Sequence, residues 1–220
     1  MTFTGSLPLF LGTVVAISVT GVMMPGPVTA AAIAKGYHRK WAGFHIAIGH
    51  AVVEFPTIAL IALGFSTFLS HPYVSIAIGV LGGAMLVFMG GSMILSRGGV
   101  LEKLKKGGTE GHTDPFPYHP VIAGVITTAS NPYYFLWWAT LGAALTMNAL
   151  QFGMMVLVVF AILHWSIDLG WDVLLSYTVN RSRGLWNDRT YIAVFAVCGA
   201  IMLIFGLWFA ASAVYAVFRL

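Results

Sequence analysis

The chain has 220 residues, of which 59% are hydrophobic and only 8% are charged, and its formal net charge is +4. A soluble domain carries about 25% charged residues because its surface faces water, so this composition excludes a water-soluble globule and predicts an integral membrane protein. The basic residues lie in short stretches between apolar segments, as membrane orientation signals do, which argues against a nucleic-acid partner. The single cysteine, Cys198, excludes an internal disulfide or dithiol pair.

Six segments are long and apolar enough to cross a bilayer, which takes about 20 residues. No Lys or Arg precedes Lys35, so we expect the first segment to be a permanent span and not a cleaved signal peptide. Of the eleven basic residues, all but Arg219 fall between segments 1 and 2, 3 and 4, or 5 and 6. The positive-inside rule makes those connections cytoplasmic and places both termini outside. The predicted spans of this multi-pass cell-membrane protein are 7–34, 43–65, 74–95, 120–147, 151–178 and 190–218.

Three spans in each half give the halves opposite orientations in the membrane. We therefore expect an all-α fold of six transmembrane helices in two inverted 3+3 repeats, as in several transporter folds. The repeats would be 1–95 and 120–220, forming a single membrane domain. Residues 96–119 between them are rich in glycine and proline and predict a cytoplasmic linker with one or two helical turns.

The first and fourth segments are interrupted at corresponding places. The first contains Pro25-Gly26-Pro27 and the fourth contains Asn131-Pro132. Proline removes a backbone donor and clashes with the preceding turn, and a carbonyl freed in this way within lipid must find a partner or line a polar cavity. An ordinary proline kink is the alternative, but the matched positions favour functional breaks.

The second and fifth segments carry buried charge in a shared pattern. His50 precedes Glu54 by four residues, and His164 precedes Asp168 by four, so each pair lies on one helix face. An ionised acid at the bilayer centre costs about 2.5–3.5 kcal/mol. Asp172 lies nearer the predicted cytoplasmic end, either in the same cavity or at the interface.

Three interpretations of these acids compete. They pair with the histidines and only hold helices together; they bind a cation, such as an ammonium group, a guanidinium group or a metal ion; or they carry protons, with the histidines as relays. A further aromatic run follows the fourth-segment break. It either lines a substrate path by cation–π contact or faces lipid, and we expect the tryptophan pair to face lipid; the run is Tyr133, Tyr134, Phe135, Trp137 and Trp138.

These motifs together resemble the lysine exporter superfamily (LysE/RhtB type). The resemblance covers most of the chain and rests on four short stretches: Pro25-Gly26-Pro27 with Gly36 and Ala42-Gly43; Gly49-His50 through Glu54; Gly124 through Asn131-Pro132; and His164 with Asp168 and Trp171. It implies a secondary transporter that exports amino acids or related small cationic or zwitterionic solutes. The superfamily also contains metal-ion exporters and dithiol carriers, and the single cysteine departs from the dithiol branch.

We therefore expect a proton- or ion-coupled exporter working by alternating access, with no catalytic residue and no cofactor. Its partners would be a small-molecule substrate, protons or ions, and the lipid bilayer, and the sequence leaves a homodimer open. The expected substrate- and ion-binding residues are Glu54, Asp168, His50, His164, Pro25, Gly26, Pro27, Asn131, Pro132 and Asp172. Two alternatives are a divalent-metal exporter and an intramembrane metal-dependent hydrolase, each with the ligands His50, Glu54, His164 and Asp168.

Overall fold

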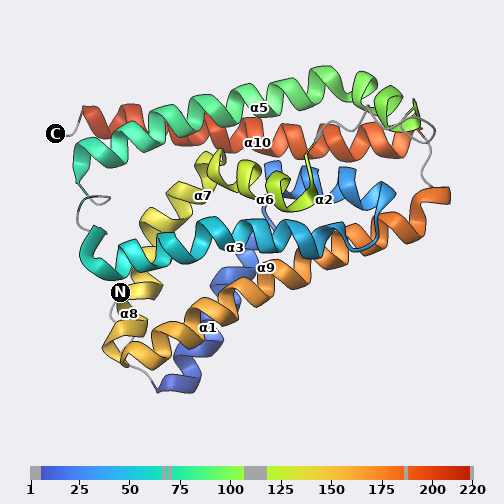
Figure 1. The fold of residues 1–220 in the computed structure, drawn as a ribbon. Helices are drawn as coiled ribbons and strands as arrows, with labels where there is room; N and C mark the ends of the chain where they lie inside the picture. The colour runs from blue at the N-terminus through green and yellow to red at the C-terminus, as the bar shows by residue number, and fades with distance from the viewer. Residues whose placement is uncertain (1–5, 66–67, 69–70, 107–117, 186–187, 219–220) are drawn as a thin grey trace.

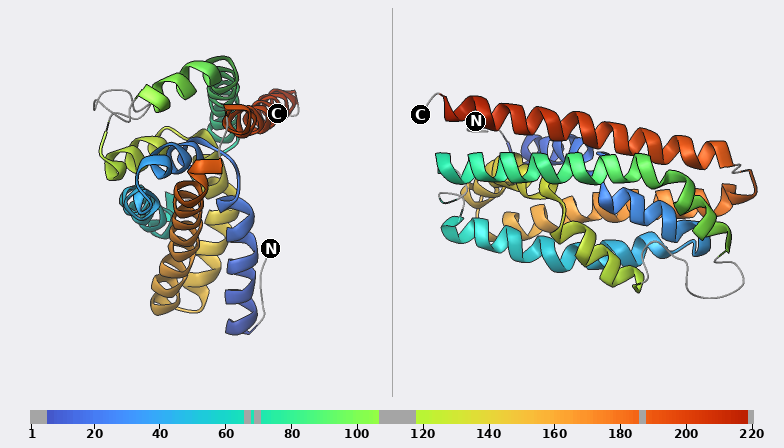
Figure 2. Two further views of the ribbon diagram at one scale, coloured as in Figure 1. Left: turned by 90° about the vertical axis from the view of Figure 1, so that its right-hand side faces the viewer. Right: turned by 90° about the horizontal axis from the view of Figure 1, so that it is seen from above.

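The computed structural model describes residues 6–65, 68, 71–106, 118–185 and 188–218, and in this part of the chain all regular structure is helical (Figure 1). Two long helices, α5 (Pro72–Lys106) and α10 (Asp188–Val217), lie side by side and form one layer of the molecule (Figures 1 and 2). Glycines let their backbones touch. A Cβ built on Gly83 would lie 2.7 Å from the carbonyl oxygen of Gly206, and one on Gly199 would lie 2.7 Å from that of Gly90. Small residues allow this close approach between membrane helices.

The first predicted segment consists of two helices, α1 (Leu7–Val22) and α2 (Pro27–His38), whose axes are bent by 72°. The missing N–H of proline and its fixed φ suit the first position of a helix and prevent continuation of the preceding one. Pro27 occupies the first position of α2. The predicted break at residues 25–27 is therefore confirmed.

The fourth predicted segment is also broken, between α6 (Pro120–Ala129) and α7 (Pro132–Trp137). The Asn131 side chain caps α7, because its Oδ1 accepts a hydrogen bond of 3.1 Å from the Tyr133 N–H. Beyond α7 the chain widens into a π-helical turn, η2 (Trp138–Gly142), and then continues as α8 (Ala143–Gln151).

The helices that carry the buried acids, α3 (Ala42–Leu60) and α9 (Met154–Ser182), lie against each other. The Trp165 indole N–H donates to the Ala47 carbonyl at 2.9 Å. Helix α3 continues through Pro56 into a π-helical turn, η1 (Ile61–Phe65), in which Gly64 adopts a φ of 100°. Only glycine takes that conformation readily, so the helix ends there. A short 3₁₀ turn, η3 (Arg183–Leu185), follows α9.

Each acid-bearing helix also packs on the broken segment of the other half of the chain. Helix α3 contacts α6, and α9 contacts α2 and α1. Gly49 and Gly124 form the crossing of α3 and α6: a Cβ on Gly49 would meet the Val121 carbonyl oxygen, and one on Gly124 the Ile46 carbonyl oxygen. The site described below therefore depends on contacts between the two halves.

Within the described residues, four helices are long and apolar enough to cross a membrane, and the bent pair of α1 and α2 would be a fifth span. The fourth predicted segment is present as shorter pieces, of which α6 is an apolar helix of 10 residues. These helices agree with an integral membrane protein; the count of six, the repeats and the side of the termini stay predictions. The four long spans are Ala42–Phe65, Pro72–Leu95, Met154–Ser182 and Ile192–Val217.

The predicted linker of residues 96–119 begins within helix α5, and the division of the chain into two repeats joined by a linker stays a prediction. Helix α5 continues to Lys106, longer than the one or two turns expected. After Gly98-Gly99 the sequence supplies leucine, glutamate and lysine, which favour helix strongly enough to carry it past the glycines. Residues 107–117 lie outside the described residues.

Candidate functional site

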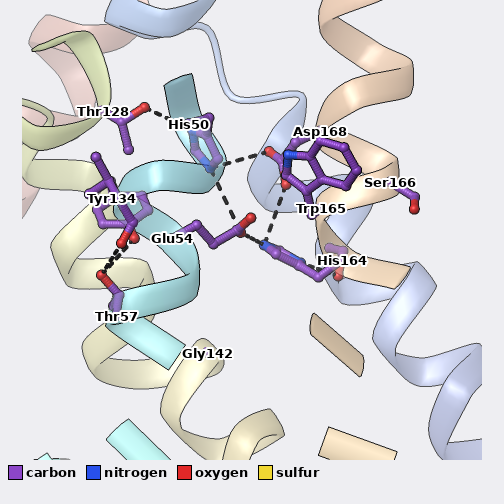
Figure 3. A network of polar contacts seen from close by, with 12 residues as sticks. His50, Glu54, Thr57, Thr128, Tyr134, Gly142, His164, Trp165, Ser166 and Asp168 are labelled. Carbon is purple, nitrogen blue, oxygen red and sulfur yellow. Dashed lines mark hydrogen bonds and ion pairs between the residues drawn. The ribbon is translucent and has the colours of Figure 1, made fainter. Parts of the chain in front are cut away.

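Two histidines and two carboxylates meet where α3 and α9 lie in contact, and we call His50, Glu54, His164 and Asp168 the polar quartet (Figure 3). Each helix supplies one histidine and, one turn later, one acid. The His164 Nε2 lies 3.0 Å from Glu54 Oε1 and 3.6 Å from Asp168 Oδ2. The His50 Nε2 lies 3.7 Å from Glu54 Oε1 and 3.9 Å from Asp168 Oδ1. Each histidine thus faces both acids.

The second nitrogen of each histidine is held by a hydroxyl group on a broken segment. His50 Nδ1 lies 2.9 Å from Thr128 Oγ1 on α6, and His164 Nδ1 lies 2.7 Å from Ser18 Oγ on α1. Both contacts cross between the two halves of the chain. His50 of the first half contacts Thr128 of the second half, and His164 of the second half contacts Ser18 of the first. They fix the ring orientations so that both Nε2 atoms point at the acids.

The two acids differ in their surroundings. Glu54 is completely buried, with 0% of its surface exposed, whereas Asp168 is 9% exposed. Both oxygens of Glu54 and the Oδ2 of Asp168 lack a hydrogen bond of good geometry among the described residues, although the histidine nitrogens stand at ion-pair distance. Buried carboxylates usually accept hydrogen bonds. The quartet therefore has capacity for a further donor or cation.

A cavity of about 70 Å³ adjoins the quartet and lies between the two breaks. Met24 and Gly26 from the first break and Asn131 from the second line it. A Cβ built on Gly26 would lie 3.7 Å from the Asn131 Nδ2, so the breaks are in close proximity. His50, His164 and Asp168 face the same cavity. Polar groups of the quartet and residues of both backbone interruptions thus line one cavity.

Of the ten residues predicted from sequence, six line this cavity: His50, His164, Asp168, Asp172, Gly26 and Asn131. Asp172 is only 4% exposed and lines the cavity. Glu54 lies behind the histidines, in contact with both but outside the cavity wall. The prolines Pro25, Pro27 and Pro132 shape the breaks without lining the cavity.

The expectation that the tryptophan pair faces lipid is wrong. Trp137 and Trp138 are 7% and 2% exposed and line the cavity. The Trp137 ring stacks on the His164 imidazole, with centroids 4.8 Å apart and planes at 21°. The direction of these side chains depends on the helix phase after the break. For Trp137 it also depends on Gly21, because the indole occupies the space that a Cβ at position 21 would fill.

Sequence reasoning missed Ser18 and Thr128, and it named Tyr134 only as a member of the aromatic run, without its contact to His50. Tyr134 packs edge-on against His50, with ring centroids 5.6 Å apart, and its hydroxyl donates to Thr57 Oγ1 at 2.9 Å. The available signal was a hydroxyl group within an otherwise apolar segment. That signal is weak, because a membrane-helix hydroxyl commonly bonds its own backbone, as Thr127 does to the Ala123 carbonyl at 2.7 Å.

Comparison with known proteins identifies a family and a relative. The sequence model of the family described as "LysE type translocator" matches residues 19–213. A protein named "Putative amino acid efflux protein YcgF", from Bacillus subtilis (strain 168), is 24% identical over 186 residues, which cover 84% of this chain and 87% of that protein. No solved structure matches.

Proposed function

Because the chain belongs to the LysE type translocator family, we propose that this multi-pass membrane protein exports amino acids or related cationic or zwitterionic solutes in exchange for protons or ions. The observation that carries the proposal is the meeting of the polar quartet with both helix breaks around one cavity. Transporters commonly bind solutes where interrupted helices meet near the middle of the membrane.

The cavity lining combines features that suit the two charges of a zwitterion. Asp168 and Asp172 offer negative charge on one wall. Val28 and Thr29, in the first turn of α2, form another part of the wall. The first turn of a helix carries partial positive charge and is suited to anions. An amino group would bind at the acids, and a carboxylate would bind near the start of α2.

The quartet is the proposed coupling element. A carboxylate faced by two histidines can exchange a proton as the solute's positive charge arrives or leaves. Asp168 contacts the cavity directly, whereas Glu54 contacts both histidines from behind. The positive group of the solute would compete with the two histidines for Asp168, and the histidines would transmit the change in charge to Glu54.

Six spans in two inverted repeats account for this arrangement. The exchange of helices between halves, α3 with α6 and α9 with α2 and α1, is what an inverted pair of repeats would produce. The ends of α2, α5 and α9 lie toward one end of the molecule (right in Figure 1). These ends carry Lys35, Arg39 and Arg181, which favours the cytoplasmic placement of that end and external termini.

Transport by purified protein in proteoliposomes tests the proposal. Vesicles with an imposed pH gradient are given a panel of radiolabelled amino acids. We expect at least one to accumulate, and accumulation to collapse when a protonophore removes the gradient. Ser166→Ala is a matched control, because the Ser166 hydroxyl donates to the Ile162 carbonyl of its own helix and is exposed.

Two outcomes would contradict this reading. If the solute still accumulated after the protonophore and after all other ion gradients had been dissipated, the proposed coupling to protons or ions would be wrong. Transport of divalent metal but of no amino acid would favour metal as the cargo instead, since donor atoms of His50, Glu54 and Asp168 all lie within 4.8 Å of one another. The hydrolase alternative gains nothing from membership in a transporter family.

The Thr128 hydroxyl gives a separate prediction about the orientation of His50. Thr128→Val keeps the side-chain shape but leaves the buried His50 Nδ1 without its partner at 2.9 Å. The unpaired group costs about 1–3 kcal/mol, so we expect transport to be roughly tenfold slower. Initial rates in the same vesicles measure this, and Thr128→Ser should restore the wild-type rate. If Thr128→Ser and Thr128→Val lowered the transport rate equally, side-chain packing and not the hydroxyl group would be responsible for the lower rate.

A further inference from the structure

A second polar cavity, of about 420 Å³, lies where α2 ends and α3 and α6 begin. Its wall carries Arg39, Lys40, His45 and His119, and no carboxylate occurs among the described residues that line it. It shares no lining residue with the cavity beside the quartet. The positive charge of Arg39 and Lys40 is therefore not neutralised within this wall.

Two helix starts add to the positive potential. The first residues of α3 and α6, Ala42 and Pro120, both line the cavity. The start of a helix carries partial positive charge, and α3 has 19 residues and α6 has 10. His119 adds a donor: its Nδ1 accepts the Val121 N–H at 3.4 Å, so the proton of the neutral ring is on Nε2.

The cavity opens beside side chains typical of a membrane surface. Trp41 is 52% exposed, and the Lys40 Nζ lies 5.8 Å from the centroid of its ring. An exposed indole beside a long cationic side chain is characteristic of the layer where lipid headgroups meet water. Helix α9 closes the cavity through Asn180, whose Nδ2 donates to the Gly36 carbonyl at 3.1 Å.

We propose that this cavity binds the phosphate group of an anionic phospholipid headgroup. Basic pockets between membrane helices bind acidic headgroups because paired charges and hydrogen bonds act there at low dielectric. The walls come from α2, α3, α6 and α9, the elements that also carry the polar quartet or the breaks beside it. A bound headgroup would hold these four elements together at one membrane face. The proposal does not depend on which solute is transported.

Thermal unfolding of the purified full chain in detergent tests the site. Short-chain phosphatidylglycerol is titrated against short-chain phosphatidylcholine and against inorganic phosphate at constant ionic strength. We expect saturable stabilisation by phosphatidylglycerol, and an apparent affinity about 30-fold weaker in Arg39→Gln/Lys40→Gln, because two surface charges are lost. The matched control is Arg181→Gln/Arg189→Gln, which removes two exposed charges outside the cavity and should keep the wild-type affinity.

Three results would overturn the proposal. Equal stabilisation by phosphatidylcholine would mean that headgroup charge is irrelevant. The same loss of affinity in the control variant would indicate diffuse surface charge rather than this cavity. Inorganic phosphate that stabilises as well as phosphatidylglycerol, with the same dependence on Arg39 and Lys40, would make the cavity a site for soluble anions. If the double variant is unstable, Lys40→Arg with Arg39→Lys keeps the charge and must retain binding.

Discussion

Glu54→Gln is expected to lower the rate of the proposed solute export per folded molecule at least about 100-fold. Glutamine has the shape of glutamate without its charge, so the His164 Nε2, 3.0 Å away, and the His50 Nε2, 3.7 Å away, both lose their shared partner. Breaking a buried ion pair costs about 3–5 kcal/mol, and each 1.4 kcal/mol on a rate-determining step slows it tenfold. The measurement is initial export from proteoliposomes, normalised to the monodisperse fraction after gel filtration.

The normalisation separates transport from simple helix packing. If the quartet only holds α3 and α9 together, Glu54→Gln will unfold more readily while its folded fraction exports at the wild-type rate. Asp168→Asn extends the test, because Asp168 faces the cavity and should also weaken the apparent affinity for solute. Unimpaired export by both variants would end the proposed role of these acids.

Gly124→Ala is expected to destabilise the protein by about 1–3 kcal/mol, as overpacked cores do. The added methyl group would meet the Ile46 carbonyl oxygen of α3, a backbone atom that cannot turn aside as a side chain could. Gly49→Ala repeats the experiment from the other helix, against the Val121 carbonyl oxygen. Either change pushes α3 from α6 and lengthens the contact between His50 and Thr128, so export should fall as well.

Thermal unfolding in detergent measures the first effect, and initial export rates measure the second. Gly170→Ala is the matched control, since a Cβ on Gly170 of α9 has nothing within 4 Å, and alanine favours a helix by about 1 kcal/mol over glycine. It should be neutral or stabilising. Unchanged unfolding in Gly124→Ala together with a wild-type export rate would mean that the crossing of α3 and α6 is looser than described.

The features predictable from sequence are those fixed within a few residues of the chain. Proline determines the starts of α2 and α7 locally, and a spacing of four residues places His50 with Glu54 on one helix face. Contacts between helices are not local. Nothing within the 120–147 segment indicates that Thr128 meets His50, and the buried position of Trp137 requires Gly21, far away in the chain. Pro56 shows that a local signal can also mislead. On its own this proline would suggest a third break, yet α3 continues through it.

The arrangement of the quartet along the chain also sets an order of events while the protein is being made. Positions 54 and 164 are 110 residues apart, which at about 5–20 residues per second is roughly 5–20 s of translation. Throughout that interval the nascent α3 holds an acid whose cross-helix partner has not left the ribosome. His50, one turn before Glu54, is synthesised with it and offers an imidazole on the same face. Biogenesis therefore has a provisional polar partner for the acid built into the same helix, which His164 joins once α9 is inserted.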